Sequence, residues 1–190
     1  MFIPLLYGSV RTDRQGIRAA RYLAKRLAQR GCEAPIIDPM EHSLPLLDKM
    51  YKEFAPGSAP AVMEELAEMY RRADGFIIVS GEYNHSIPPA LSNLIDHFME
   101  EYFWRPAGIA CYSGGRFGGV RAAMQLRAML PEVGMITIPS LLPIASIGTA
   151  FDENDEPTAA YIDEQTTKFF DEFMWFVQAC KAQRAHGTPY

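Results

Sequence analysis

Cysteine is scarce in this sequence, and the cysteines that occur follow no pattern that binds metal or builds a disulfide framework. The three, Cys32, Cys111 and Cys180, form no CxxC pair and are too few to staple a small secreted domain. The four histidines show no HExxH or Cys/His spacing either, so no metal site is expected. Scarce cysteine without a framework favours a reducing compartment.

Long apolar runs and basic patches are also missing. No stretch of about 18 apolar residues occurs, as a membrane span would need, and the N-terminus lacks the basic and then apolar layout of a signal peptide. The net charge is -5, so the phosphates of a nucleic acid would find no cationic surface. These absences predict a cytoplasmic protein that neither inserts into a membrane nor binds nucleic acid.

Apolar runs alternate with segments of helical periodicity along the 190 residues, which fit one α/β domain over 1–190. Strands are predicted at 2–7, 34–38, 75–80, 107–112 and 135–138, and helices at about 17–27, 61–72, 88–98, 120–130 and 162–180. This alternation predicts a parallel sheet covered by helices on both faces. Ligands of such sheets bind beyond the carboxyl ends of the strands, so the loops after the first, third and fourth strands are the candidate site.

The loop from Gly8 to Gly16, after the first strand, has the composition of an anion site. A helix start offers unpaired N–H groups and a positive dipole end. Ser9 adds a hydroxyl, and Arg11 and Arg14 add cationic forks that suit phosphate oxygens. The loop is neither a Walker loop nor a GxGxxG fingerprint. A tight turn with a capping serine and two solvated arginines is the alternative interpretation.

The loop 80–89 follows the most buried strand and reads Ser-Gly-Glu-Tyr-Asn-His-Ser-Ile-Pro-Pro. Its polar backbone groups would face the ligand crevice. Tyr83 can pack beside a flat ring while nearby N–H groups meet ring nitrogens and carbonyls, a combination that a flavin requires. The alternative is an ordinary Asn/Ser turn that caps the following helix.

The loop from Ser113 to Gly119 contains four glycines, which let backbone approach a ligand closely and permit positive φ. A flexible connection is the alternative. A serine hydrolase is excluded, because Ser113 does not lie in GxSxG and no partner triad is indicated.

Two of these motifs resemble the NADPH-dependent FMN reductase family: Gly-Ser-x-Arg after the first strand, and Glu-Tyr-Asn-x-Ser-Ile-Pro-x-x-Leu-x-Asn-x-Ile-Asp after the third. The matching residues are Gly8, Ser9, Arg11, Glu82, Tyr83, Asn84, Ser86, Ile87, Pro88, Leu91, Asn93, Ile95 and Asp96. The resemblance implies a flavodoxin-like three-layer α/β sandwich with a five-stranded parallel sheet in the order 2-1-3-4-5. Arg14 stands where the family usually has a small hydroxyl residue, and Gly16 stands where it often has Asn.

The resemblance also implies bound FMN, with its phosphate at the first loop and its ring between the other two. The predicted cofactor-binding residues are Ser9, Arg11, Arg14, Gln15, Gly16, Ile17, Glu82, Tyr83, Asn84, His85, Ser113, Gly114, Gly115 and Arg116. NADPH or NADH would pass a hydride to flavin N5, and a quinone, chromate, ferric complex or similar small molecule would then accept it in a ping-pong sequence. No catalytic side chain is assigned, because the flavin carries the chemistry.

Two other functions stay open at this point. A flavodoxin-type single-electron carrier would accumulate a stable semiquinone during titration, and a flavin-free binding or regulatory domain would be colourless. Apolar residues expected to point outward, together with the resemblance, predict a homodimer or homotetramer. These residues are Tyr102, Phe103, Trp104, Met174 and Trp175.

Overall fold

A five-stranded sheet in the order β2-β1-β3-β4-β5 forms the centre of the computed structural model, which describes residues 1–190. Every neighbouring pair of strands is parallel. The predicted topology is therefore confirmed. The strands are β1 (Leu5–Tyr7), β2 (Ile36–Ile37), β3 (Phe76–Gly81), β4 (Pro106–Tyr112) and β5 (Ile136–Ile144).

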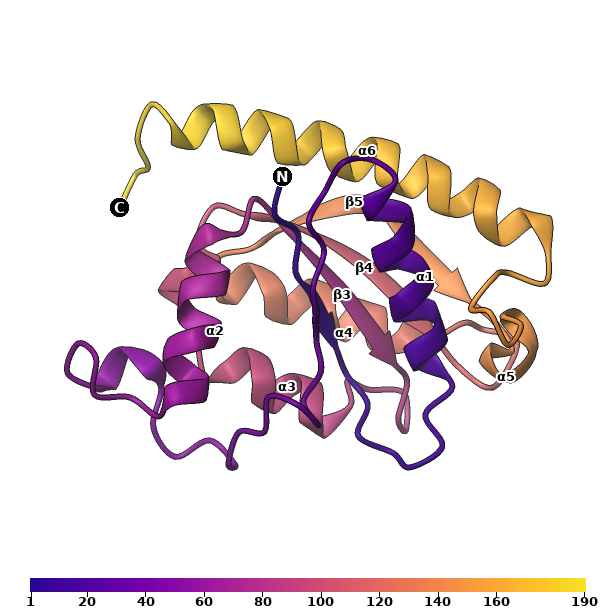
Figure 1. Ribbon diagram of the computed structural model, residues 1–190, viewed down its shortest axis with the longest axis horizontal. Coiled ribbons are helices and arrows are strands. Elements are labelled where there is room, and N and C mark those ends of the chain that lie inside the picture. Colours follow the sequence, from indigo (N-terminus) through magenta and orange to yellow (C-terminus); the bar gives the residue numbers. More distant parts are fainter.

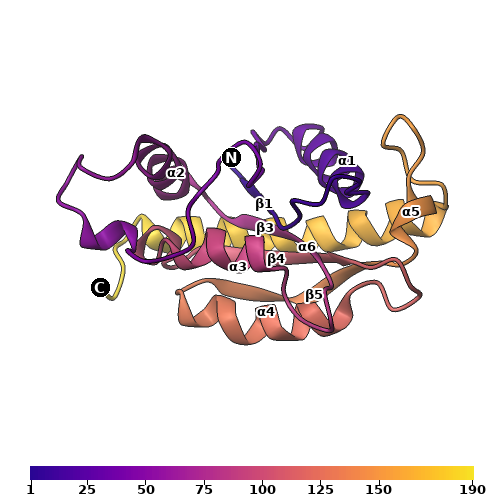
Figure 2. The ribbon, with the colours of Figure 1, turned by 90° about the horizontal axis from the view of Figure 1, so that it is seen from below.

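Helices cover both faces of the sheet, and Figure 2 shows β4 and β5 lying between α6 and α4. On one face are α1 (Gly16–Ala28) and α6 (Ala160–Arg184), and on the other are α2 (Ala61–Arg72), α3 (Pro89–Asp96) and α4 (Val120–Glu132). Short helical turns are η1 (Tyr51–Glu53), η2 (Glu100–Tyr102) and α5 (Ile147–Ala150). Figure 1 shows α6 extending across the length of the molecule. None of these helices combines the length and apolar character needed to cross a bilayer.

The central strand β3 shows why this sequence folds into three layers. All its residues are buried, and successive side chains of a strand point to opposite faces. Ile77 and Val79 enter the core beneath α1 and α6, whereas Phe76 and Ile78 enter the core beneath α2, α3 and α4. A continuous apolar run is therefore required at this position, because neither face meets water.

The fifth strand is longer than predicted, because it continues past Pro139 to Ile144. A proline lacks the N–H needed in a central strand, but β5 is an edge strand, where that loss is tolerated. The register against β4 also shifts between Ala107 and Ile109. The extension brings Ile144 beside Tyr112, at the carboxyl edge of the sheet. The first two strands are shorter than predicted.

The expectation of five outward apolar residues was largely wrong. Tyr102 is fully buried in the core beneath α2 and α3. Phe103 and Trp104 are half-buried, and the ring of Tyr190 lies against both, with centroids 5.5 and 4.9 Å away. Met174 is half-buried too, and Trp175 alone of the five is exposed, at 65%. Tyr102, Phe103 and Trp104 therefore pack mainly within this chain.

Candidate functional site

A cavity of about 220 Å³ opens at the carboxyl ends of β1, β3 and β4, where the strand order reverses. It contains residues from all three predicted loops. The lining residues are Ser9, Arg11, Asp13, Arg14, Gln15, Gly16, Gly81, Glu82, Tyr83, Tyr112, Ser113, Gly114 and Ile147. Five residues predicted to bind the cofactor do not line it, namely Ile17, Asn84, His85, Gly115 and Arg116.

The turn that leads into α1 has the unpaired groups that an anion site needs. The helix has no side-chain cap, and in the turn before it the backbone N–H groups of Thr12 and Asp13 donate to no group of the chain. Ser9 does not cap the helix, because its hydroxyl forms a hydrogen bond with that of Tyr83, 2.9 Å away. The guanidinium of Arg11 is exposed and has no partner. These donors and this charge lie together and are suited to a phosphate.

Arg14 lies at the same loop, but its guanidinium is already paired. Both terminal nitrogens contact the carboxylate of Asp38, each at 2.6 Å, and Nη1 also donates to the carbonyl of Ser9 at 3.0 Å. The hydrogen bond to Asp38 raises the pKa of Arg14 above its ordinary value. The Asp38 side chain is only 4% exposed. Arg14 therefore holds the shape of the loop, and its contact with phosphate stays a prediction.

The backbone N–H and the side chain of Ile17 both have partners within the chain. Its N–H donates to the carbonyl of Arg14, and its side chain packs against the core under α1 and α6. A contact between its backbone and phosphate stays a prediction.

Two tyrosines, Tyr83 and Tyr112, line the cavity, and Tyr7 lies behind Tyr112. The hydroxyls of Tyr7 and Tyr112 lie 3.5 Å apart, and burial raises the pKa of both. The ring of Tyr112 occupies the space beside Gly16, so a Cβ at that position would overlap it. Position 16 therefore requires glycine, because the phenol ring of Tyr112 fills the space that a Cβ would need. This contact explains why glycine stands where the family often has Asn.

The loop after β3 forms a tight hairpin that does not cap α3. Tyr83 and Ser86 exchange backbone hydrogen bonds of 3.1 and 2.9 Å, and Asn84 and His85 between them have φ of 51° and 64°. Positive φ at both central residues is the property of a type I′ turn. The N-cap of α3 is Pro88, without a side-chain bond, so the capping alternative was wrong. Asn84 and His85 are exposed at the tip.

Glu82 directs its carboxylate away from the cavity and toward α4. That carboxylate accepts the N–H groups of Arg121 and Ala122, at 3.0 and 3.3 Å, and contacts the Arg121 guanidinium at 3.4 Å. The N-cap residue of α4 is Gly119, which has no side chain to offer. Glu82 therefore supplies the missing cap from another strand, and its negative charge suits the helix dipole. Its backbone remains part of the lining.

The glycine loop after β4 is held in place yet open toward solvent. The carbonyl of Gly115 accepts the Ser113 hydroxyl at 3.0 Å and the Ser146 N–H at 3.1 Å. No atom lies within 4 Å of a Cβ built on Gly114 or Gly115. The N–H groups of Gly114 and Gly115 have no acceptor in the chain. The loop thus presents fixed, unpaired donors at the rim of the cavity.

Several residues of the site were missed. Tyr112 ends β4 directly before the glycine loop, and this position at the carboxyl end of a strand was the available signal. Asp38 likewise ends the β2 segment with a charge. Ile147 reaches the cavity only because β5 extends farther than predicted, and no local signal marks it.

Strand order, a cavity at the point where that order reverses, and a first helix without a side-chain cap define a protein of the flavodoxin-like class. More specifically, residues 1–149 match the family described as NADPH-dependent FMN reductase. The chain belongs to that family, whose members are flavin-dependent oxidoreductases that use FMN and NAD(P)H.

Similar proteins support this assignment. A quinone reductase from Escherichia coli (strain K12) is 32% identical over 165 residues, which cover 85% of each chain. In fold, the chain is similar to FerB, a flavoenzyme NAD(P)H:(acceptor) oxidoreductase from Paracoccus denitrificans, with a TM-score of 0.77, 22% identity, and coverage of 94% and 97%. A flavodoxin from Pseudomonas aeruginosa, in a single-residue mutant form, gives a TM-score of 0.54, 20% identity, and coverage of 90% and 99%.

The residues present fit FMN. The unpaired amides and free arginine at the start of α1 match a phosphate, and the unpaired glycine amides at the rim match the acceptor atoms of a flat heterocycle.

Proposed function

We propose that residues 1–190 act as one domain that reduces quinones and similar small molecules with electrons from NADPH or NADH, by way of bound FMN, in a ping-pong sequence. One observation carries the proposal. A single cavity is lined both by the arginine-containing loop before the uncapped helix α1 and by the open glycine loop after β4. The quinone reductase of Escherichia coli supports a quinone acceptor. Chromate and ferric complexes are included as further acceptors.

When bound, FMN supplies the hydride chemistry. Ser9, Arg11 and the free amides of the first loop hold the phosphate. The amides of Gly114 and Gly115 stabilise negative charge that develops at the ring edge. Tyrosine hydroxyls are protonated at neutral pH, and burial raises the pKa of Tyr7 and Tyr112 further, so they act as hydrogen-bond groups and not as bases. The chain needs no acid–base pair for this reaction.

The test is the visible spectrum of purified, FMN-loaded protein before and after NADPH, followed by stopped flow and by reoxidation with 1,4-naphthoquinone. We expect bleaching of the flavin band by NADPH or NADH, and recovery on addition of the quinone. A holoprotein that stays oxidised with both nucleotides would refute the reductase.

The same titration separates the alternatives. A flavodoxin-type carrier would accumulate a stable semiquinone under stepwise reduction, whereas a flavin-free domain would remain colourless and fail to take up FMN. Parallel lines in double-reciprocal plots at varied acceptor concentration support the ping-pong order; intersecting lines contradict it.

We also propose a cytoplasmic homodimer or homotetramer that binds neither nucleic acid nor membranes. Support for self-association comes from exposed apolar side chains on the loop 39–50, where Met40, Leu46 and Leu47 are 56%, 85% and 41% exposed. Size-exclusion chromatography with light scattering tests this assembly, and a strict monomer at micromolar concentration would overturn it.

A further inference from the structure

A large aromatic side chain is exposed on the glycine loop near two arginines, one on the same loop and one at the start of α4. Phe117 is 48% exposed and belongs to neither apolar core. The guanidinium carbon of Arg116 lies 4.9 Å from the ring centre, and that of Arg121 lies 4.6 Å from it. The ring thus contributes no core packing, while two cations stay within interaction range of it.

The two arginines differ in the contacts that fix their side chains. Arg121 is fixed by Glu82, which contacts both its backbone N–H and its guanidinium. Arg116 forms no ion pair and no hydrogen bond with any residue, and it is exposed. In a chain of net charge -5, Arg116 therefore carries a free positive charge next to an open aromatic face.

This group continues directly from the cavity. Ser113 and Gly114, which line the cavity, precede Arg116 by two or three residues, and the Gly115 carbonyl holds the loop against Ser146. On the other side, Glu82 lines the cavity and holds Arg121. Phe117 and Arg116 therefore belong to the same glycine loop that supplies Ser113 and Gly114 to the cavity.

We propose that Phe117 and Arg116 form a subsite for planar aromatic anions, so that acceptors bearing a sulfonate or carboxylate are preferred. The aromatic system of the ligand stacks on Phe117, and its anionic group pairs with Arg116 in a charge-assisted hydrogen bond. Arg121 stays with Glu82, and its guanidinium carbon lies 4.6 Å from the ring centre of Phe117. The role as an acceptor subsite depends on the proposed function, whereas the binding itself does not.

Calorimetry with the FMN-loaded protein tests the binding without turnover. The probes are naphthalene-2-sulfonate and the uncharged 2-naphthol at pH 7. We expect the sulfonate to bind about tenfold more tightly than 2-naphthol, an advantage that Arg116→Gln removes and Arg116→Lys partly restores. Phe117→Ala should weaken both probes by about fivefold, because it removes the stacking surface.

A matched control is available at the opposite end of the sheet. Arg72 lies 3.9 Å over the ring of Phe2, so Arg72→Gln removes the same charge from a similar arginine–aromatic pair. It should leave both affinities unchanged. Equal affinities of the two probes for the unaltered protein, or an equal loss with Arg72→Gln, would overturn the subsite.

Steady-state kinetics then test the acceptor role, with 1,4-naphthoquinone-2-sulfonate compared with 1,4-naphthoquinone. Arg116→Gln should raise the KM of the sulfonate about five- to tenfold and change kcat less than about twofold, with the neutral quinone unaffected. A rise in the KM of NADPH alone would assign Arg116 to the nucleotide and refute the acceptor role. Absence of turnover in the unaltered protein would instead refute the proposed function, while calorimetry still decides the subsite.

Discussion

The bidentate pair of Arg14 and Asp38 is the most buried charge interaction beside the cavity, with side chains 18% and 4% exposed. Arg14→Gln would leave Asp38 with one remaining N–H donor, from Met40 at 3.0 Å. Removing one partner of a buried pair leaves an uncompensated charge, so we expect a loss of about 2–4 kcal/mol in the free energy of unfolding. Urea unfolding measures it, with Arg14→Lys as the conservative control.

The same variant tests whether the pair shapes the phosphate loop. Arg14→Gln should weaken FMN by about tenfold while riboflavin, which lacks the phosphate, changes little. Fluorescence titration with the two flavins gives the ratio. An equal loss for both would show that the pair acts on stability alone.

Gly16 tests the fit of the first helix over Tyr112. In Gly16→Ala the new methyl group overlaps a buried ring, and overpacking of this kind costs about 1–3 kcal/mol. Chemical denaturation measures the change. Gly148→Ala is the matched control, because no atom lies within 4 Å of a Cβ there, and it should stay within about 0.5 kcal/mol of the parent. Similar values for the two variants would contradict the packing argument.

Asp96 belongs to the family motif but lies on α3, outside the cavity lining. Burial raises the pKa of its carboxyl above the ordinary 3.8. The folded state therefore holds this proton more tightly than the unfolded state, and stability falls as pH rises from about 3.8 through the raised pKa. Asp96→Asn should consequently raise the melting temperature at pH 7 but not near pH 3.5. A lower melting temperature at pH 7 would mean that the charge has a partner.

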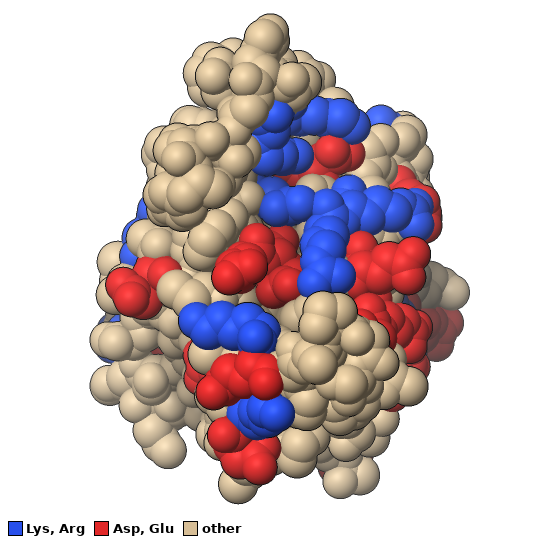
Figure 3. Space-filling view, turned by 90° about the vertical axis from the view of Figure 1, so that its left-hand side faces the viewer, with Lys and Arg blue, Asp and Glu red and all other residues tan.

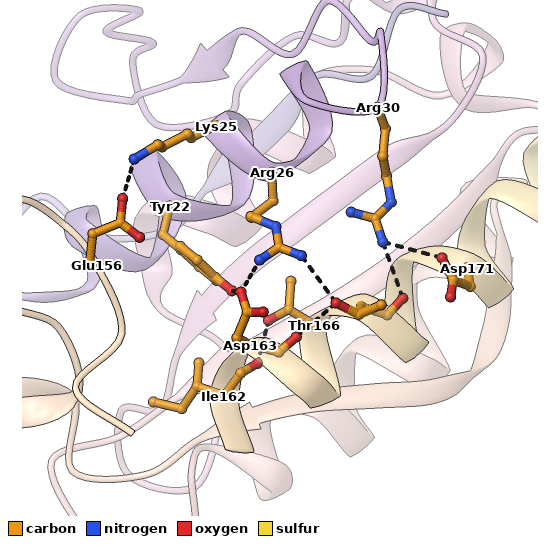
Figure 4. Close-up of polar contacts among 10 residues, drawn as sticks. Tyr22, Lys25, Arg26, Arg30, Glu156, Ile162, Asp163, Thr166 and Asp171 are labelled. Carbon is orange, nitrogen blue, oxygen red and sulfur yellow. Dashed lines mark hydrogen bonds and ion pairs between the residues drawn. The ribbon is translucent and has the colours of Figure 1, made fainter. Parts of the chain in front are cut away.

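Among the secondary-structure elements, α1 and α6 are joined by a polar seam that Figure 4 shows along their shared edge. Asp163 of α6 accepts the hydroxyl of Tyr22 at 2.7 Å and pairs with Arg26, both from α1. Asp163→Ala should cost about 1–3 kcal/mol, because the Tyr22 hydroxyl loses its acceptor and the partly buried Arg26 keeps only its hydrogen bond to Thr167.

The control for this seam is on the same helix. Asp171 pairs with Arg30 at 3.2 Å, but its side chain is 67% exposed, so Asp171→Ala should cost less than about 1 kcal/mol. Thermal unfolding of both variants gives the comparison. A larger loss for Asp171→Ala would reverse the ranking of the two contacts.

In the molecule as a whole, the two ends of the sheet have different roles. At the amino end, Asp74 accepts the Phe2 N–H and pairs with Lys181, each at 3.0 Å. Figure 3 shows this end of the molecule covered by interleaved basic and acidic side chains, so no field of one sign forms there. The carboxyl end instead leaves donors and the charge of Arg11 without partners. Ion pairs occur at both ends, including Arg14–Asp38 and Arg121–Glu82 beside the cavity, but the carboxyl end also has free donors and a free cation for a ligand.

Removing FMN should therefore destabilise the protein. A ligand that binds only the folded state adds about 2.7 kcal/mol when its free concentration is one hundred times Kd. We expect the melting temperature to rise with added FMN and less with riboflavin at the same concentration. Scanning calorimetry measures it, and an equal rise with both flavins would contradict the assignment of the phosphate to the first loop.

The fold class was predictable because its signals are local. The apolar run of β3 and the helical periodicities around it occur in neighbouring residues, and parallel strands joined by helices allow few topologies. The loops of the site were also predictable, since the carboxyl ends of the strands identify them. The end of β5 could not be predicted. A strand can continue through Pro139 only if it lies at the edge of the sheet, and the position of β5 in the sheet is not a local property of the sequence.

The kinds of groups that meet at the site can be read from the residues alone: hydroxyls, arginines and glycine backbone at three strand ends. Which of these groups are free to bind a ligand depends on contacts between segments that are distant in the chain. Arg14 is paired with a carboxylate 24 positions away, Glu82 caps a helix that begins on another loop, and Arg116 keeps its charge unpaired. The physical reason is that a charged side chain takes the partner that the sheet register brings within reach, and that register is set by the whole core.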